Sequence, residues 1–194
     1  MSDNFKNNQD IIPKDKDIKI KLNATLIVLM ITSGIIVSGL IYLIHKNIIL
    51  AAEALLLMPL LVYLSAVDIK LRLAPDWATY FTFVLATPTV ISAILSQQFG
   101  ILLDMVLGLL ICFVPLFLGA LFSKGGIGGA DVKIMMALGF LLGMNRAFLA
   151  LLTCLLCAII FTTIRIKMGK MGKNERFALI PFIFIGAALA MIVL

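Results

Sequence analysis

Residues 25–44 read TLIVLMITSGIIVSGLIYLI, twenty consecutive positions without a charged side chain. A helix of about 20 apolar residues is long enough to cross a hydrocarbon core about 30 Å thick. Further apolar runs that reach or approach this length cover roughly residues 49–67, 78–95, 101–122, 147–164 and 177–194. Strands of a membrane barrel would alternate polar and apolar residues, and these runs do not. The sequence therefore predicts an all-α, polytopic membrane bundle with six to seven transmembrane helices.

The composition of the whole chain favours the same fold class. Of its 194 residues, 62% are apolar and 13% are charged, and the mean hydropathy is +1.15. A soluble domain is about 45–50% apolar, so the charged side chains are too few to cover the surface of a soluble protein. The net charge of +6 does not indicate nucleic acid, because the basic residues fall in short gaps between apolar runs. We expect the chain to contact the lipid bilayer and no nucleic acid.

The distribution of lysine and arginine predicts the orientation. Residues 1–24 are expected to be a cytosolic polar tail, and residues 25–194 one membrane-embedded domain. A seventh apolar run, 132–144, would span only about 20 Å as a helix, so it either crosses a locally thinned or protein-lined region or is continuous with the helix after it. If it crosses, 14 of the 16 basic residues lie on the N-terminal side of the membrane: five in the tail, two each in 68–77 and 123–133, and five in 165–176. The positive-inside rule then predicts a multi-pass protein of the cell membrane with a cytoplasmic N-terminus.

Two carboxylates stand at boundaries of the apolar runs. Asp68 follows the run 49–67 and Asp131 precedes the run 132–144, so the predicted topology places both at the cytoplasmic boundary. Two carboxyl groups at one depth on different helices can share a proton, because like charges a few ångströms apart do not easily both ionise. One carboxylate can then activate a water while the other protonates a scissile carbonyl oxygen. On spacing alone, the same residues could equally cap helices or pair with lysines.

Small residues precede Asp131, since residues 125–133 read GGIGGADVK. The glycines and Ala130 remove side chains from the approach to the acid, so that a substrate backbone or a neighbouring helix can come close. A phosphate-binding loop is disfavoured, because the stretch has no Gly-Lys-Ser/Thr. The stretch that begins at Asp68 reads DIKLRLAPD, in which Pro75 can redirect the chain before the next helix.

Together these two stretches resemble the type IV prepilin and preflagellin peptidases, membrane aspartic proteases of the Gly-x-Gly-Asp kind. The first motif of that family, an Asp followed by basic residues and Pro-Asp or Pro-Asn, matches residues 68–76. The second, Gly-x-Gly-Asp-x-Lys, matches residues 128–133, with Ala130 in place of the second glycine. Pro181-Phe182 resembles the family's C-terminal pattern less specifically. The resemblance covers roughly residues 48–194.

The resemblance implies an aspartic endopeptidase that removes the short basic leader of prepilin-like or preflagellin-like precursors at the cytoplasmic membrane face. Asp68 and Asp131 would be the catalytic pair, supported by Gly128, Gly129, Ala130, Lys133, Lys70 and Arg72. The three basic residues either anchor the chain on the inside or keep one carboxylate of the pair ionised.

Many bacterial members of the family carry a cytosolic insert after the first helix, with paired Cys-x-x-Cys motifs and a methyltransferase activity. Here only residues 45–48 stand at that place, and the cysteines are Cys112, Cys154 and Cys157. Two thiols within one apolar helix are too few for a zinc site, which takes four ligands. We therefore expect the peptidase-only form, with no cofactor and no metal.

Two other functions fit parts of the sequence. A relative of presenilin and signal-peptide peptidase would share the Gly-x-Gly-Asp element but would also carry Tyr-Asp and Pro-Ala-Leu, where this chain has Val67-Asp68 and ALIP at 178–181. A small transporter would use the two aspartates for cation coupling, which predicts acids near mid-membrane and internal repeats. The remaining membrane acids, Glu53 and Asp104, fall near the outer ends of their helices and are expected to be interfacial or helix-pairing residues.

Overall fold

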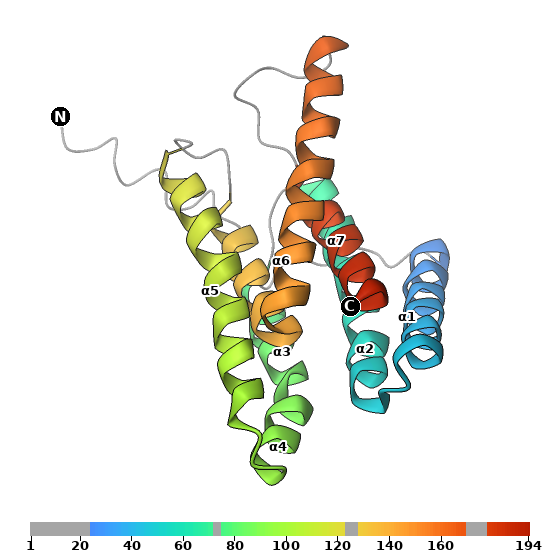
Figure 1. The fold of residues 1–194 in the computed structure, drawn as a ribbon. Coiled ribbons are helices and arrows are strands. Elements are labelled where there is room, and N and C mark those ends of the chain that lie inside the picture. Colours follow the sequence, from blue (N-terminus) through green and yellow to red (C-terminus); the bar gives the residue numbers. More distant parts are fainter. Residues whose placement is uncertain (1–23, 72–74, 123–127, 170–177) are drawn as a thin grey trace, which may run out of the picture.

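The computed structural model describes residues 24–71, 75–122, 128–169 and 178–194, and within these ranges every regular element is a helix (Figure 1). The helices are α1 (Ala24–His45), α2 (Ile48–Leu71), α3 (Asp76–Leu85), α4 (Thr87–Leu95), α5 (Phe99–Phe122), α6 (Gly129–Lys167) and α7 (Ile180–Val193). Five stretches are long and apolar enough to cross a membrane, with α3 and α4 counted as one, and α7 is a shorter apolar helix. The prediction of an all-α, multi-pass membrane protein is confirmed. The predicted N-terminal tail lies outside the described residues, except for Ala24.

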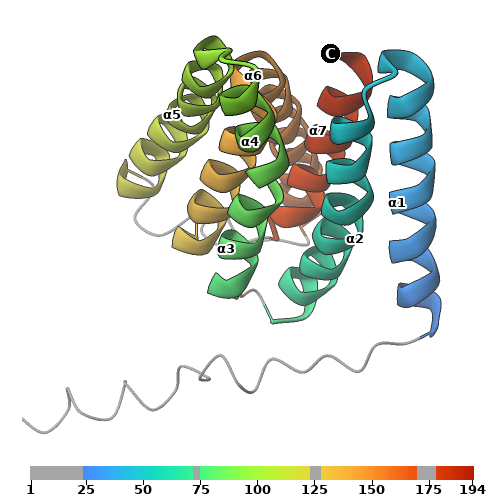
Figure 2. The same cartoon turned by 90° about the horizontal axis from the view of Figure 1, so that it is seen from below.

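Helices α1 and α2 form a hairpin with a two-residue turn. Asn47 caps α2, because its side-chain Oδ1 accepts hydrogen bonds from the backbone N–H groups of Ile49 and Leu50, at 3.0 and 3.2 Å. The helices pack closely where Gly34 meets Pro59, since a Cβ atom on Gly34 would lie 2.9 Å from the proline ring. Figure 2 shows α1 at one edge of the bundle, where it diverges from α2 away from the turn.

The apolar run predicted at 78–95 consists of two helices that meet at Ala86. Pro88 lies in the first turn of α4. Proline is accommodated there, because the first N–H groups of a helix have no partner within it. Thr89, in the first turn of α4, donates a hydrogen bond from its side chain to Glu53 of α2.

Helix α6 contains the runs predicted at 132–144 and 147–164, joined at a sharp bend. At the bend Gly143 has φ 73° and ψ 174°, a conformation outside the helical region. Figures 1 and 2 show that the arm before the bend and the arm after it run back alongside each other. Asp131 and Cys154, on opposite sides of the bend, interact electrostatically, whereas a straight helix would separate them by about 35 Å. The chain direction therefore reverses at Gly143.

Glycines set the distances between the central helices. A Cβ atom on Gly108 of α5 would collide with the backbone oxygen of Gly139 on the first arm of α6, and the reverse substitution would collide in the same way. A Cβ atom on Gly186 of α7 would collide with the backbone oxygen of Ala150 on the second arm. Small residues are the usual means of close helix contact in membranes. These contacts hold the first arm of α6 against α5 and the second arm of α6 against α7.

Candidate active site

Asp68 lies in the last turn of α2, with only 5% of its surface exposed. Its Oδ2 accepts a hydrogen bond of 3.0 Å from the backbone N–H of Ile180, the first residue of α7. Leu179, the residue that precedes α7, has no polar side chain with which to cap the helix, and Pro181 has no N–H. Asp68 therefore supplies the acceptor that the N-terminus of α7 lacks in its own sequence, where a carboxylate also interacts favourably with the helix dipole.

Asp131 is the third residue of α6, and its side chain folds back onto the residue before the helix. Its carboxylate accepts a hydrogen bond from the backbone of Gly128, as an acidic residue at this position does in a capping box. A Cβ atom on Gly128 would lie 2.9 Å from Asp131 Oδ2, which is too close. Glycine at 128 therefore makes room for the carboxylate. A Cβ atom on Gly129 would meet nothing within 4 Å, and Ala130 is half-buried.

The two aspartates come together although 63 residues separate them in the sequence. Asp68, in the last turn of α2, and Asp131, in the first turn of α6, interact electrostatically. Each carboxylate is oriented by a backbone group at the N-terminus of a helix, α7 for Asp68 and α6 for Asp131. The structure therefore places two carboxyl groups within electrostatic reach of each other, each held by a backbone group that does not itself titrate.

The three basic residues that were predicted to support the aspartate pair do not form one group in the described structure. Lys133 forms an ion pair with Asp76, 2.8 Å from Nζ to Oδ1, which joins the first turn of α6 to the first turn of α3. The two side chains are 56% and 59% exposed, so the pair contributes about 0–1 kcal/mol to stability. Lys70 is exposed on the last turn of α2. Arg72 lies outside the described residues.

An apolar groove of about 520 Å³ opens beside Asp68, where α1 diverges from α2 (Figure 2). The first turns of α1 and α7 and the last turns of α2 line it, with the apolar side chains of Leu26, Leu29, Val62, Ala66 and Phe184, and Lys70 lies at its edge. Ile69 and Lys70, the two residues that follow Asp68 on α2, line the groove together with Pro181 of α7.

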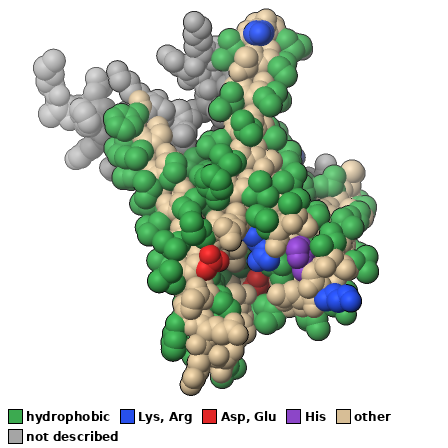
Figure 3. Space-filling model, in the orientation of Figure 1, with side chains coloured by type: hydrophobic (Ala, Val, Ile, Leu, Met, Phe, Trp, Pro, Cys, Tyr) green, Lys and Arg blue, Asp and Glu red, His purple; other side chains and the backbone are tan. Residues whose placement is uncertain are grey.

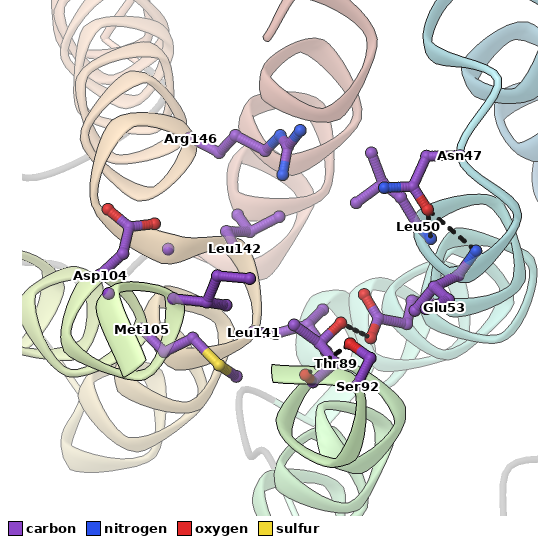
Figure 4. Close-up of a pocket in the computed structure, with 14 residues that line it drawn as sticks. Asn47, Leu50, Glu53, Thr89, Ser92, Asp104, Met105, Leu141, Leu142 and Arg146 are labelled. Carbon is purple, nitrogen blue, oxygen red and sulfur yellow. Dashed lines mark hydrogen bonds between the residues drawn. The ribbon is translucent and has the colours of Figure 1, made fainter. Parts of the chain in front are cut away.

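Glu53 and Asp104 lie at the other end of the bundle and do not join this site. The expectation of a helix-pairing role fits Glu53, which is 3% exposed and accepts a 2.5 Å hydrogen bond from Thr89 of α4. Figure 4 shows both acids around a cavity that also contains Arg146. Sequence reasoning missed this cluster, and it missed the backbone groups that orient Asp68 and Asp131. The signal for the first of those backbone groups was present, because Leu179-Ile180-Pro181 begins a helix without a capping side chain.

Comparison with known proteins identifies the family of the chain. The sequence profile of the type IV leader peptidase family matches residues 55–163, more than half of the chain, and the matched segment contains both Asp68 and Asp131. A curated relative is the prepilin leader peptidase/N-methyltransferase of Bacillus subtilis (strain 168), 28% identical over 138 residues that cover 71% of this chain and 54% of the relative. The chain thus matches about half the length of that relative. No solved structure matches the chain. The chain belongs to the type IV leader peptidase family.

Proposed function

We propose that this protein is an aspartic endopeptidase that removes the short basic leader from prepilin-like or preflagellin-like precursors. The observation that carries the proposal is the juxtaposition of Asp68 and Asp131 at one end of the helices. Membership of the type IV leader peptidase family supports the reaction class. The predicted excess of basic residues on the side of the membrane where the two aspartates lie supports a site at the cytoplasmic face.

The pair performs hydrolysis without a covalent intermediate. The ionised carboxylate takes a proton from a water, whose oxygen attacks the scissile carbonyl carbon, while the protonated carboxyl donates its proton to the carbonyl oxygen. The tetrahedral intermediate then collapses: one of its hydroxyl groups gives its proton to the ionised carboxylate as the carbonyl reforms, the C–N bond breaks, and the leaving amine takes up the proton held by the other carboxyl group. The Ile180 N–H and the Gly128 backbone fix the two carboxyl groups, so that little reorientation is required for the reaction.

The groove beside Asp68 would hold the apolar helix of the precursor. A leader peptidase substrate of this kind has a charged leader ahead of an apolar helix, so its scissile bond lies where the helix leaves the membrane. An apolar helix that lies against Leu29, Val62 and Phe184 would present that end to the carboxylate pair. The charged leader would then remain in water, which avoids the cost of burying its charges.

The direct test mixes the purified full chain in detergent with a precursor that carries both the leader and the apolar helix. We expect one cut at the junction, unaffected by metal chelators or by reagents for serine and cysteine. Ala66→Phe, which fills the groove, should raise KM for this precursor. The matched control is Ala52→Phe on the exposed face of the same helix, which should leave KM unchanged. No cleavage by the wild-type protein, or cleavage that a chelator abolishes, would contradict the proposal.

A further inference from the structure

A second polar site lies at the end of the bundle opposite the two aspartates. Glu53 and Asp68 are both on α2, 15 residues apart, which places them about 22 Å from each other along the helix axis. A cavity of about 380 Å³ lies between the start of α2, helix α4, the start of α5 and the bend of α6. Figure 3 shows acidic and basic side chains close together in the lower half of this face, surrounded mainly by hydrophobic side chains and backbone. The proposed peptidase reaction uses none of these side chains.

Arg146 supplies the positive charge of the cavity. It lies in the first turn after the bend at Gly143, and its Nη2 donates a 3.1 Å hydrogen bond to the backbone oxygen of Leu194. Its Nε is buried and has no hydrogen-bond partner among the described residues. Buried polar groups in proteins are almost always paired with protein or water, so the guanidinium group of Arg146, which lines the cavity, has donor capacity beyond its bond to Leu194. The planar guanidinium group is well suited to two oxygens of a phosphate.

Glu53 and Asp104 supply negative charge on the other walls (Figure 4). Both carboxylates interact electrostatically with Arg146. The Glu53 carboxylate accepts hydrogen bonds from the hydroxyl and the backbone of Thr89, and a carboxylate has about four acceptor positions, so capacity remains for further donors. A primary ammonium group carries three N–H donors and no acceptor, so it can donate hydrogen bonds to the free acceptor positions of these carboxylates.

We propose that this cavity binds a group that carries both a phosphate and a primary ammonium, as in the headgroup of phosphatidylethanolamine. Arg146 would hold the phosphate, and Glu53 and Asp104 would hold the ammonium. The volume lies within the range of about 300–1,000 Å³ that is typical of small-molecule sites. Quaternary ammonium groups such as choline usually bind against aromatic rings. Among the described residues that line the cavity there is no aromatic ring, so choline fits the cavity less well than a primary ammonium. Ile101 and Leu141 provide apolar wall beside the charged groups.

Lipid-depleted full-length protein in detergent can be titrated with phosphatidylethanolamine, phosphatidylcholine and phosphatidylglycerol of identical acyl chains. Native mass spectrometry would measure retention, and the midpoint of thermal unfolding would measure stabilisation. We expect phosphatidylethanolamine to bind at least about tenfold more tightly than the other two, since each of them lacks one charge-assisted hydrogen-bond partner. Equal binding of the three lipids would overturn the proposal. A parallel titration with glycerophosphoethanolamine, which has the same headgroup without acyl chains, distinguishes a lipid from a soluble ligand. If it binds as tightly as the lipid, the ligand is a soluble zwitterion.

Two variants test the assignment of the charges. Arg146→Gln and Glu53→Gln should each abolish the preference for phosphatidylethanolamine. Lys46→Asn is the matched control, because Lys46 is a basic residue at the same end of the bundle that does not line the cavity. Retention of the full preference by both cavity variants would overturn the assignment. The headgroup series on the wild-type protein remains decisive if Arg146→Gln fails to fold, and leader cleavage by the wild-type protein reports on the two aspartates separately.

Discussion

The carboxylate of Asp68 and the backbone N–H of Ile180 are joined by a hydrogen bond of 3.0 Å across 112 residues of sequence. One side chain thus belongs to the candidate catalytic pair and also caps the N-terminus of α7. The contact holds the end of α2 against the start of α7, and the groove for an apolar helix lies along the same two helices. Different substitutions at Asp68 can therefore remove its proposed catalytic role and its capping role separately.

Asp68→Ala should lower the free energy of unfolding by about 1–3 kcal/mol, because the buried N–H of Ile180 loses its acceptor. Asp68→Asn should lower it much less, since the amide oxygen of asparagine can still accept that hydrogen bond. Thermal unfolding in detergent measures both. Asp76→Ala is the control, because Asp76 is 59% exposed and forms only a surface ion pair. Equal stability of the alanine and asparagine variants at 68 would show that the cap is not needed.

Ala130 occupies the position of the second glycine in the second motif. If the position requires only a small side chain, Ala130→Gly should keep the cleavage rate within about threefold, apart from a loss of stability of about 1 kcal/mol or less from the helix propensity of glycine. Ala130→Leu should abolish cleavage by blocking the approach to Asp131. Cleavage assays on protein of matched folded fraction would measure both effects. A fully active leucine variant would place this stretch outside the site.

The bend at Gly143 should depend on glycine. A Cβ atom there would collide with the carboxylate of Asp104, and the φ of 73° disfavours any side chain. Gly143→Ala should therefore destabilise the protein by about 1–3 kcal/mol. Gly39→Ala on α1, where a Cβ atom would meet nothing within 4 Å, should be neutral or stabilising. Thermal unfolding of the two variants measures the difference in their stability. Equal stability of Gly143→Ala and Gly39→Ala would show that the bend tolerates a side chain.

The apolar runs predicted the helices well, because hydrocarbon thickness imposes a length that the sequence shows directly. The run 49–67 became α2, Ile48–Leu71, with Asp68 inside its last turn. The run 132–144 was recognisable as a separate segment because it is short and is followed by Arg146. The reversal of the chain direction at Gly143 could not be predicted, since a positive φ at glycine does not show in the hydropathy of the sequence.

The candidate pair was found because Asp68 and Asp131 stand at the boundaries of apolar runs, where an acid is conspicuous. Their orienting groups are backbone atoms, which no side-chain pattern reveals. The pairing of Lys133 with Asp76 was missed for a different reason: a lysine near two acids can reach either, and only the packing of α3 against α6 decides between them. The charged cavity was missed because Glu53, Asp104 and Arg146 are far apart in sequence and each alone resembles an interfacial residue.

The proposed orientation predicts the outcome of reporter fusions. Fusions after Leu71 and after Gly169 should report a cytoplasmic location, and fusions after Gln97 and after Leu194 the opposite side, because the basic segments 68–77 and 165–176 are expected inside. The informative comparison is between Gly169 and Leu194. A fusion after Leu194 that reports cytoplasm would require the orientation of α7 and of the second arm of α6 to be redrawn.

The most direct test of the account is the single-turnover rate of leader cleavage by Asp68→Asn, by Asp131→Asn and by the double variant, with Asp76→Asn as control. Asparagine preserves the shape and the hydrogen-bond acceptor but cannot exchange a proton, so each single variant should lose at least about a hundredfold in rate. The double variant should be little slower than either single one, because the two residues act as a unit, and Asp76→Asn should retain most of its activity. Cleavage at the wild-type rate by either Asp68→Asn or Asp131→Asn would contradict the assignment of these residues as the catalytic pair.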